Sequence, residues 1–196
     1  MTSGPTEGTP FRASAKGYLD NAMVTGRYSS GLVHEFDRHV KNRTANIFQI
    51  LGEIAALEGA PMARPSRTKP ASQFKGKFLN GLWHKHYTQA RFIAANLMLH
   101  WKPNKLRRLI KESYGGRPFF DEQAAKELSH RFVQDGYLER SGRKQMTGEW
   151  IIFAKQDDKA YYLTLANHTE EDETIWHRCK ACASEFPELY IIQENR

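Results

Sequence analysis

The sequence lacks the features that mark secreted and membrane proteins. It has only two cysteines, Cys179 and Cys182, too few for the disulfide framework of a small secreted domain. It has no run of about 18 apolar residues, which excludes a membrane-spanning helix. The first ten residues are small and polar and lack the apolar stretch of a secretory signal. We therefore expect a cytoplasmic protein that does not contact a membrane.

Motifs for cofactors and metals are also scarce. There is no Walker-type loop, no G-x-G-x-x-G and no G-x-S-x-G, so neither a nucleotide cofactor nor a serine hydrolase is indicated. Cys179 and Cys182 form a single C-x-x-C, which His168 and His177 could complete to four zinc ligands. The two cysteines also recur at helical spacing with Ile175, which favours packing in a core. We expect no cofactor and no metal.

Acidic residues are few in the first three quarters of the chain. Residues 1–145 hold 24 of the 29 Lys and Arg but only 12 of the 22 Asp and Glu, while the net charge of the whole chain is +7. A basic body attracts polyanions through its long-range field and through release of counterions. The charge therefore favours nucleic acid as the partner, RNA first and DNA second, although plain solubility would also account for it.

The N-terminal part is expected to hold a flexible tail and one long helix. Residues 1–29 begin with a stretch rich in Ser, Thr, Gly and Pro and are assigned to the tail. Residues 30–58 are assigned to an amphipathic helix whose apolar side chains recur three or four apart, namely Val33, Phe36, Val40, Ile47, Ile50, Ile54 and Leu57. This stripe packs either on the rest of the chain or, through residues 30–57, on a second copy or a partner protein.

A linker and a globular domain are expected to follow. Residues 59–73 contain three prolines and three basic residues and predict a linker. Residues 74–196 are assigned to one α+β domain, with mostly helical structure up to Trp101 and a β-hairpin at about 149–167. A C-terminal helix follows the hairpin. The fold class expected is thus α+β, with a helical N-terminal two-thirds, a small antiparallel sheet and a last helix.

Two groups of residues suggest acid–base chemistry. The segment 83–87 contains His84, Lys85 and His86, and imidazoles with nearby cations can cleave a phosphodiester without a metal. The second group is one face of the hairpin with Glu149, Thr164 and, just past the strand, His168. Either group could instead be an ordinary polar surface. They would form one site if the first segment lies over the hairpin.

Basic residues outside these groups suggest how nucleic acid could be held. The candidates for contacting nucleic acid are Lys85, Arg91, Arg107, Arg108, Lys126, Arg131, Arg143 and Lys144. The helix expected at 122–134, followed by the basic turn 141–145 and the strand from Glu149, is similar to the helix-and-wing pattern of winged-helix DNA-binding units. This likeness covers about a sixth of the chain and identifies no family.

Two classes of function follow from these observations. The first is a small metal-independent ribonuclease of the microbial toxin type, with His84, His86, His168, Glu149 and Thr164 as catalytic candidates. The second is a protein without enzymatic activity, either a winged-helix-like DNA binder or a dimerising adaptor. The distance between the histidines of 83–87 and His168 separates the two classes, because a shared site requires them to meet.

Overall fold

A computed structural model describes residues 14–117 and 119–193 of the chain. Within these residues, strands from widely separated parts of the sequence form one five-stranded sheet in the order β1-β5-β4-β3-β2. Strand β1 is parallel to β5, and the other pairs are antiparallel. The strands are β1 (Arg27–Tyr28), β2 (Ser72–Gln73), β3 (Trp83–Tyr87), β4 (Glu149–Gln156) and β5 (Lys159–Ala166).

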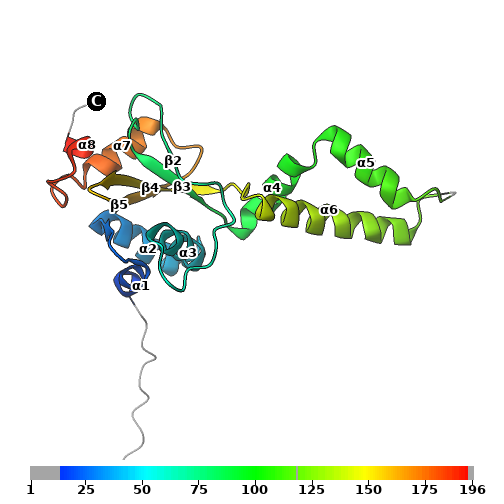
Figure 1. Ribbon diagram of the computed structural model, residues 1–196, viewed down its shortest axis with the longest axis horizontal. Coiled ribbons are helices and arrows are strands. Elements are labelled where there is room, and N and C mark those ends of the chain that lie inside the picture. The colour runs from blue at the N-terminus through cyan, green and yellow to red at the C-terminus, as the bar shows by residue number, and fades with distance from the viewer. Residues whose placement is uncertain (1–13, 118, 194–196) are drawn as a thin grey trace, which may run out of the picture.

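Helices cover both faces of the sheet (Figure 1). One face packs against α1 (Ala15–Ala22), α2 (Ser30–Asn42) and α3 (Ile47–Glu58), and the hydrophobic cluster between them includes Phe36, Ile54 and Phe153. The other face packs against α7 (Asp172–Lys180) and α8 (Tyr190–Gln193), with a second cluster that includes Ile152 and Trp176. The sheet is therefore the middle layer of the body of the molecule.

Three helices leave this body as a projecting arm (Figure 1). They are α4 (Ile93–His100), which follows a short 3₁₀ turn at Ala90–Phe92, α5 (Pro103–Tyr114) and α6 (Glu122–Gly142). The arm has a small hydrophobic cluster of its own around Leu97, Trp101 and Leu109. The indole N–H of Trp101 donates a hydrogen bond of 2.7 Å to the carbonyl oxygen of Phe132, which fastens the end of α4 to α6.

The predicted fold class is wrong in its central point. The N-terminal two-thirds are not helical throughout, because β1, β2 and β3 all precede the hairpin and belong to the same sheet. The main error falls on residues 83–87, which were assigned to a helix. They form β3, whose side chains alternate between the two covered faces of the sheet, as the period of a strand requires. The hairpin itself is present, with Lys155 paired to Ala160.

The long helix expected over residues 30–58 is two helices. Helix α2 ends at Arg43, which adopts a left-handed conformation with φ of 53°, and Asn46 caps the start of α3 by accepting the N–H of Phe48. The apolar stripe is turned toward the sheet, and Phe36, Ile50 and Ile54 are 0% exposed. These side chains are used within the chain and are not available to a partner.

The segments at 1–29 and 59–73 also differ from expectation. Within the predicted tail, residues 15–28 form α1 and β1, and Leu19 is 0% exposed, while residues 1–13 lie outside the described part. The predicted linker runs along the edge of the sheet, where the buried ammonium of Lys85 donates to Ser66, Thr68 and the carbonyl oxygen of Lys69. Lys85 also lies 3.3 Å from Glu53 of α3.

The described helices do not meet the requirements of a membrane span. Within residues 14–117 and 119–193, no helix combines the length and the apolar character that a bilayer crossing needs.

Candidate functional site

Strand pairing brings the histidines of β3 to the start of β4. His84 pairs with Ile152 and His86 with Trp150. Because side chains alternate along a strand, His84 and His86 share one face with Trp150, while Trp83, Lys85 and Tyr87 point to the face covered by α1–α3. The rings of His84 and His86 have centroids 5.5 Å apart. The first group of candidate residues is thus on a strand, and not on the helix face expected from the sequence.

His168 joins this group from the loop that follows β5. Its ring stacks on that of His86 with centroids 5.3 Å apart and an interplanar angle of 23°. Trp150 contacts His84 and His168, with centroid distances of 5.4 and 4.2 Å. We call His84, His86 and His168 the histidine cluster. The convergence that would link the two sequence candidates therefore occurs, through strand pairing.

The carbonyl oxygen of Gly148 holds two of the three rings. It lies 3.1 Å from Nδ1 of His86 and 2.6 Å from Nε2 of His168. A carbonyl oxygen only accepts, so both of these nitrogens carry a proton, and the hydrogen bonds assign the tautomers. In each neutral ring the other nitrogen, Nε2 of His86 and Nδ1 of His168, then has its lone pair available for a proton.

Gly148 is glycine because the chain passes too close for any side chain. A Cβ built on Gly148 would lie 1.9 Å from the carbonyl oxygen of Tyr87. This close approach at the end of β3 places the Gly148 carbonyl between the two histidines. The glycine is therefore part of the geometry of the cluster.

Burial lowers the pKa of two histidines of the cluster, His84 and His86. Burial lowers the pKa of His86 to about 4, and the neighbouring His84, His168 and Lys69 act in the same direction. The pKa of His84 is also lowered, first by burial and then by the charges of His168 and Lys69. His86 is consequently neutral at pH 7, whereas His168 is exposed at the surface.

The other two catalytic candidates lie outside the cluster. Glu149 accepts a hydrogen bond of 2.7 Å from the hydroxyl of Tyr87 and forms an ion pair of 2.5 Å with Arg91. Both contacts lie on the face of the sheet covered by α1–α3. Thr164 donates to Glu35 of α2 at 2.9 Å. Burial raises the pKa of Glu35, although hydrogen bonds from Leu165 N–H and Thr164 oppose the shift. Glu149 and Thr164 thus hold helices and loops to the sheet.

The basic candidates divide into engaged and exposed groups. Lys85 is buried and all of its donors are used. Ion pairs with carboxylates within 4.0 Å engage Arg91, Arg108, Lys126, Arg131 and Arg143. Arg107 and Lys144 are exposed and have no such carboxylate among the described residues. Burial lowers the pKa of Lys85, and Glu53 opposes this shift.

The helix-and-wing pattern expected around residues 122–153 does not form. Helix α6 continues through Gly136 to Gly142, so the residues expected to leave the helix remain in it. The basic turn at 143–145 then leads into β4 without a preceding strand. A wing requires a hairpin at that position, and the structure has a helix there.

Three residues next to the histidine cluster were not predicted as part of a site. Gly148 and Trp150 were not among the candidates, and Lys69 fell within the predicted linker. The run 83–87 does carry a signal, because Trp83, Lys85 and Tyr87 alternate with the two histidines at the period of a strand. The loop position of His168 gives no comparable signal.

The described residues also include no metal-binding group of side chains. Among residues 14–117 and 119–193, no group of three or more His, Cys, Asp or Glu has an arrangement that could hold a metal ion. Cys179 and Cys182 are free thiols in the core between α7 and the sheet, and burial raises the pKa of both.

Comparisons with known proteins were made for the whole chain. No protein-family model, no curated protein and no solved structure matches it.

Proposed function

We propose that this chain is a metal-independent endoribonuclease, of the type found among small microbial toxins, and that the histidine cluster is its cleavage site. The observation that supports the proposal is the meeting of His86, from β3, and His168, from the loop after β5, which share one carbonyl acceptor. Two imidazoles held this way provide a base and an acid, which are the two groups that RNA transesterification needs.

The roles follow from the hydrogen bonds. Neutral His86 takes the proton of the 2′-hydroxyl on Nε2, since its Nδ1–H is held by Gly148. The 2′-oxygen then attacks the phosphorus, and the bond from phosphorus to the 5′-oxygen breaks. His168 keeps its Nε2–H on Gly148 and, in the role of the acid, gives a proton from Nδ1 to the departing 5′-oxygen. The products are a 2′,3′-cyclic phosphate and a 5′-hydroxyl, and no metal takes part.

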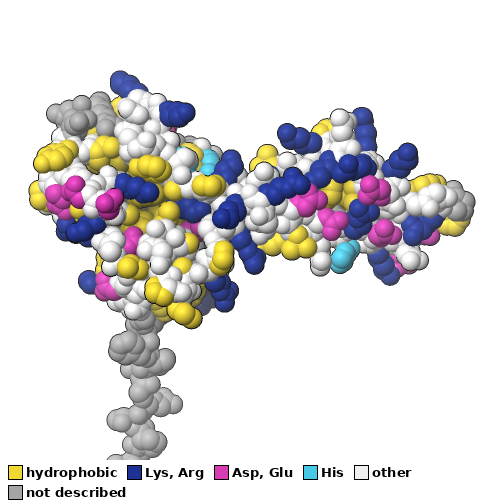
Figure 2. Space-filling model, in the orientation of Figure 1, with side chains coloured by type: hydrophobic (Ala, Val, Ile, Leu, Met, Phe, Trp, Pro, Cys, Tyr) yellow, Lys and Arg dark blue, Asp and Glu magenta, His cyan; other side chains and the backbone are white. Residues whose placement is uncertain are grey.

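Cations near the cluster are suited to the phosphate charge. Lys69 is exposed, and its charge acts on both His84 and His86. Figure 2 shows Lys and Arg side chains along the arm and where the arm joins the body, close to a histidine on the surface. A chain of phosphates could run from the arm to the cluster, and opposite charges would stabilise this path.

Two substitutions test the catalytic roles while keeping the bonds to Gly148. In His86→Asn, the side-chain amide can take the place of Nδ1, and in His168→Gln the amide can take the place of Nε2. Each removes a titrating group, so we expect kcat to fall by about 10²- to 10⁴-fold. The matched control is His130→Gln, an exposed histidine of α6 on the arm, which should leave kcat unchanged. Equal activity of His168→Gln and His130→Gln would refute the proposal.

A second candidate function is nucleic-acid binding without cleavage. It is favoured by the exposed basic residues of α5, since Arg107 and Lys111 lie one helical turn apart and have no carboxylate within 4.0 Å among the described residues. A protein of this kind would bind RNA with a steep salt dependence and leave it intact. The substitutions Arg107→Ala and Lys111→Ala should then weaken binding, whereas His168→Gln should not.

A further inference from the structure

An aromatic surface surrounds the histidine cluster. Phe74 lies against His84 with centroids 4.4 Å apart and against Trp150 at 5.3 Å, edge to face. Trp150 in turn contacts His168 at 4.2 Å. Phe74, His84 and Trp150 are only partly buried, and His168 is exposed. We call Phe74, His84, Trp150 and His168 the aromatic platform. Each of the four rings contacts at least one of the others, and together they form a partly exposed aromatic border on the second hydrophobic cluster.

Two polar atoms of the platform have no partner within the chain. The indole Nε1 of Trp150 and Nδ1 of His84 are both buried, and neither has a hydrogen-bond partner among the described residues. Buried polar atoms are nearly always satisfied, so an unpaired indole nitrogen and an unpaired imidazole nitrogen on two contacting rings point to a missing partner. A water or a ligand with donors and acceptors at its edge can supply it.

The charge next to the platform is positive. Lys69 is near enough to lower the pKa of His84 and His86, after burial as the main cause. Lys69, Arg67 and Lys144 are exposed and have no carboxylate within 4.0 Å among residues 14–117 and 119–193. These segments are adjacent, since the N–H of Lys69 donates to the carbonyl oxygen of Met146. We call Arg67, Lys69 and Lys144 the neck cations.

Two carboxylates near the platform, Glu149 and Glu170, are engaged elsewhere, whereas the Asp172 carboxylate lies beside Gly76, close to Phe74. Glu149 binds Arg91 and Tyr87 on the opposite face of the sheet. Glu170, in the loop after β5, pairs with Arg178 at 2.6 Å and accepts the N–H of Asn167. The platform therefore combines aromatic faces with uncompensated cations.

We infer that the platform and the neck cations bind single-stranded RNA, with bases stacked on Phe74 and Trp150 and phosphates near Lys69. The inference rests on the proposed function, since it names the form of the substrate that reaches the histidine cluster. Stacking on aromatic side chains requires bases that are free of a duplex, and it tolerates any base because each has a π face. Duplex RNA offers only phosphates and sugars here, so it gains nothing from the platform.

Binding can be measured separately from cleavage. The probe is a fluorescent 2′-O-methyl oligouridylate of ten nucleotides, which lacks the attacking hydroxyl, and the comparison is a ten-base-pair 2′-O-methyl duplex. We expect the full chain to bind the single strand at least about 10-fold more tightly than the duplex. Phe74→Leu, which keeps apolar volume but removes the ring, should weaken single-strand binding about 5-fold or more. Phe74→Tyr should restore it.

Matched controls keep the result specific. Phe48→Leu changes an aromatic residue that is 62% exposed on α3 and should have no effect. Lys69→Ala should weaken binding and lower its salt dependence, whereas Lys159→Ala, at the far end of the hairpin, should not. Equal binding of both probes, or equal behaviour of Phe74→Leu and Phe48→Leu with both variants folded, would overturn the inference. Tight single-strand binding without cleavage of ordinary RNA would instead sustain it and refute the nuclease.

Discussion

The rings of His86 and His168 stack 5.3 Å apart, and both donate to the carbonyl oxygen of Gly148. One ring is buried and the other is exposed. The shared acceptor fixes which nitrogen of each ring is occupied, and the difference in burial separates their environments. In the proposed reaction, His86 is the base and His168 is the acid.

Gly148→Ala should damage both stability and the cluster. The new methyl group would lie 1.9 Å from the carbonyl oxygen of Tyr87, and its three nearest neighbours are all backbone atoms of Tyr87 and Thr88, which cannot turn aside as a side chain can. We expect a loss of at least about 2 kcal/mol in the free energy of unfolding, measured with urea. The control is Gly142→Ala at the end of α6, where nothing lies within 4 Å, and it should be neutral or slightly stabilising. Similar effects of the two changes would contradict the close approach.

Stability should depend on pH through His86. Its pKa is about 4 in the folded chain and 6.5 in the reference state, so the unfolded chain binds the proton more readily. The stabilisation is complete above about pH 6.5 and is lost as the pH falls toward 4, by up to about 3 kcal/mol. Denaturant unfolding between pH 4 and 7 measures this, and His86→Asn should flatten the curve. An unchanged slope in that variant would contradict the burial of a neutral imidazole.

Glu58→Gln tests how the N-terminal segment is held. The carboxylate accepts the N–H groups of Val24, Thr25 and Gly26 and the hydroxyl of Tyr162. Burial alone would raise the pKa of Glu58, but these hydrogen bonds outweigh it and lower the pKa. The side-chain amide of the variant has an NH₂ donor in place of one carboxylate oxygen and carries no charge. It therefore cannot accept all of these hydrogen bonds as the carboxylate does, and we expect a loss of about 1–3 kcal/mol in the free energy of unfolding.

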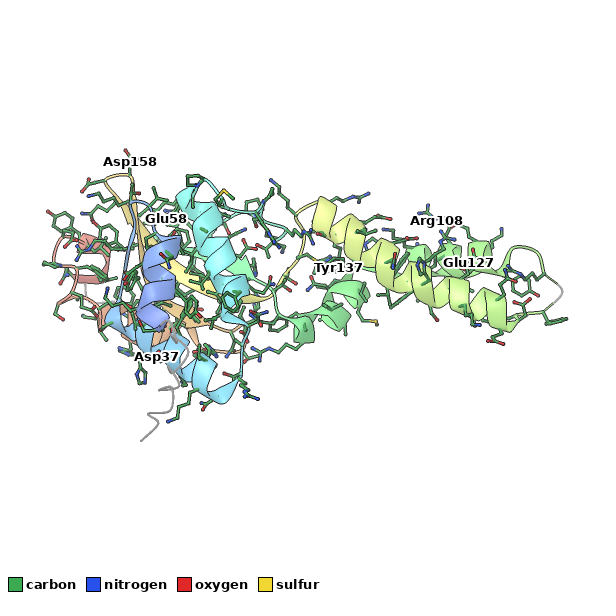
Figure 3. All side chains as sticks on the ribbon, turned by 90° about the horizontal axis from the view of Figure 1, so that it is seen from below. Asp37, Glu58, Arg108, Glu127, Tyr137 and Asp158 are labelled. Carbon is green, nitrogen blue, oxygen red and sulfur yellow. The ribbon has the colours of Figure 1, made fainter. Side chains whose placement is uncertain are left out.

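The control for this change is on the arm. Glu127→Gln removes a surface contact of 3.6 Å with Arg117 and should alter stability by less than about 1 kcal/mol. Figure 3 shows Glu58 in the body and Glu127 on the arm, so the two substitutions test separate parts of the molecule. The stabilisation that the Glu58 carboxylate contributes is complete above the pKa that this group has in the unfolded chain. It is lost as the pH falls through the lower pKa of the folded chain.

The sequence places a linker at 59–73 before the domain of residues 74–196. Whether that domain folds without the residues before it stays a prediction. Residues before and after the linker nevertheless share one core, because Ile50 and Ile54 belong to the same cluster as Ile151, Phe153 and Tyr162. A fragment starting at Phe74 would expose that face of the sheet. We expect it to lack a cooperative thermal transition in circular dichroism, and a fragment that melts like the full chain would contradict this.

The hairpin could be predicted because its two strands are neighbours in the sequence. Most of the features that were not predicted depend on contacts between residues far apart in the chain. Strands β4 and β5 are adjacent in sequence and rich in β-branched and aromatic residues, so their pairing could be predicted at the turn. The register further along could not, because a shift between Ile152 and Phe153 pairs Ile152 with Thr164 in place of Leu163. The break between α2 and α3 was missed, although the polar residues Arg43 and Thr44 stand where α2 ends.

For the same reason, the residues of the candidate site could be predicted in part, but the contacts between them could not. Residue type pointed to His84, His86 and His168, but their meeting depends on β3 pairing with β4, which are about sixty residues apart. Glu149 was placed beside His168 because the two were expected on one face of the hairpin. In the structure Glu149 binds Tyr87 and Arg91 on the opposite face, which the sequence alone does not determine.

The most direct measurement is the nature of the RNA ends after incubation with the purified full chain. A mixed-sequence RNA is incubated with chelator between pH 5 and 9, and the products are analysed by mass spectrometry. The account predicts cleavage to 2′,3′-cyclic phosphate and 5′-hydroxyl ends, because an imidazole base and an imidazole acid need no metal. RNA that is bound but remains intact across this pH range, or cleavage that stops with chelator, would contradict it.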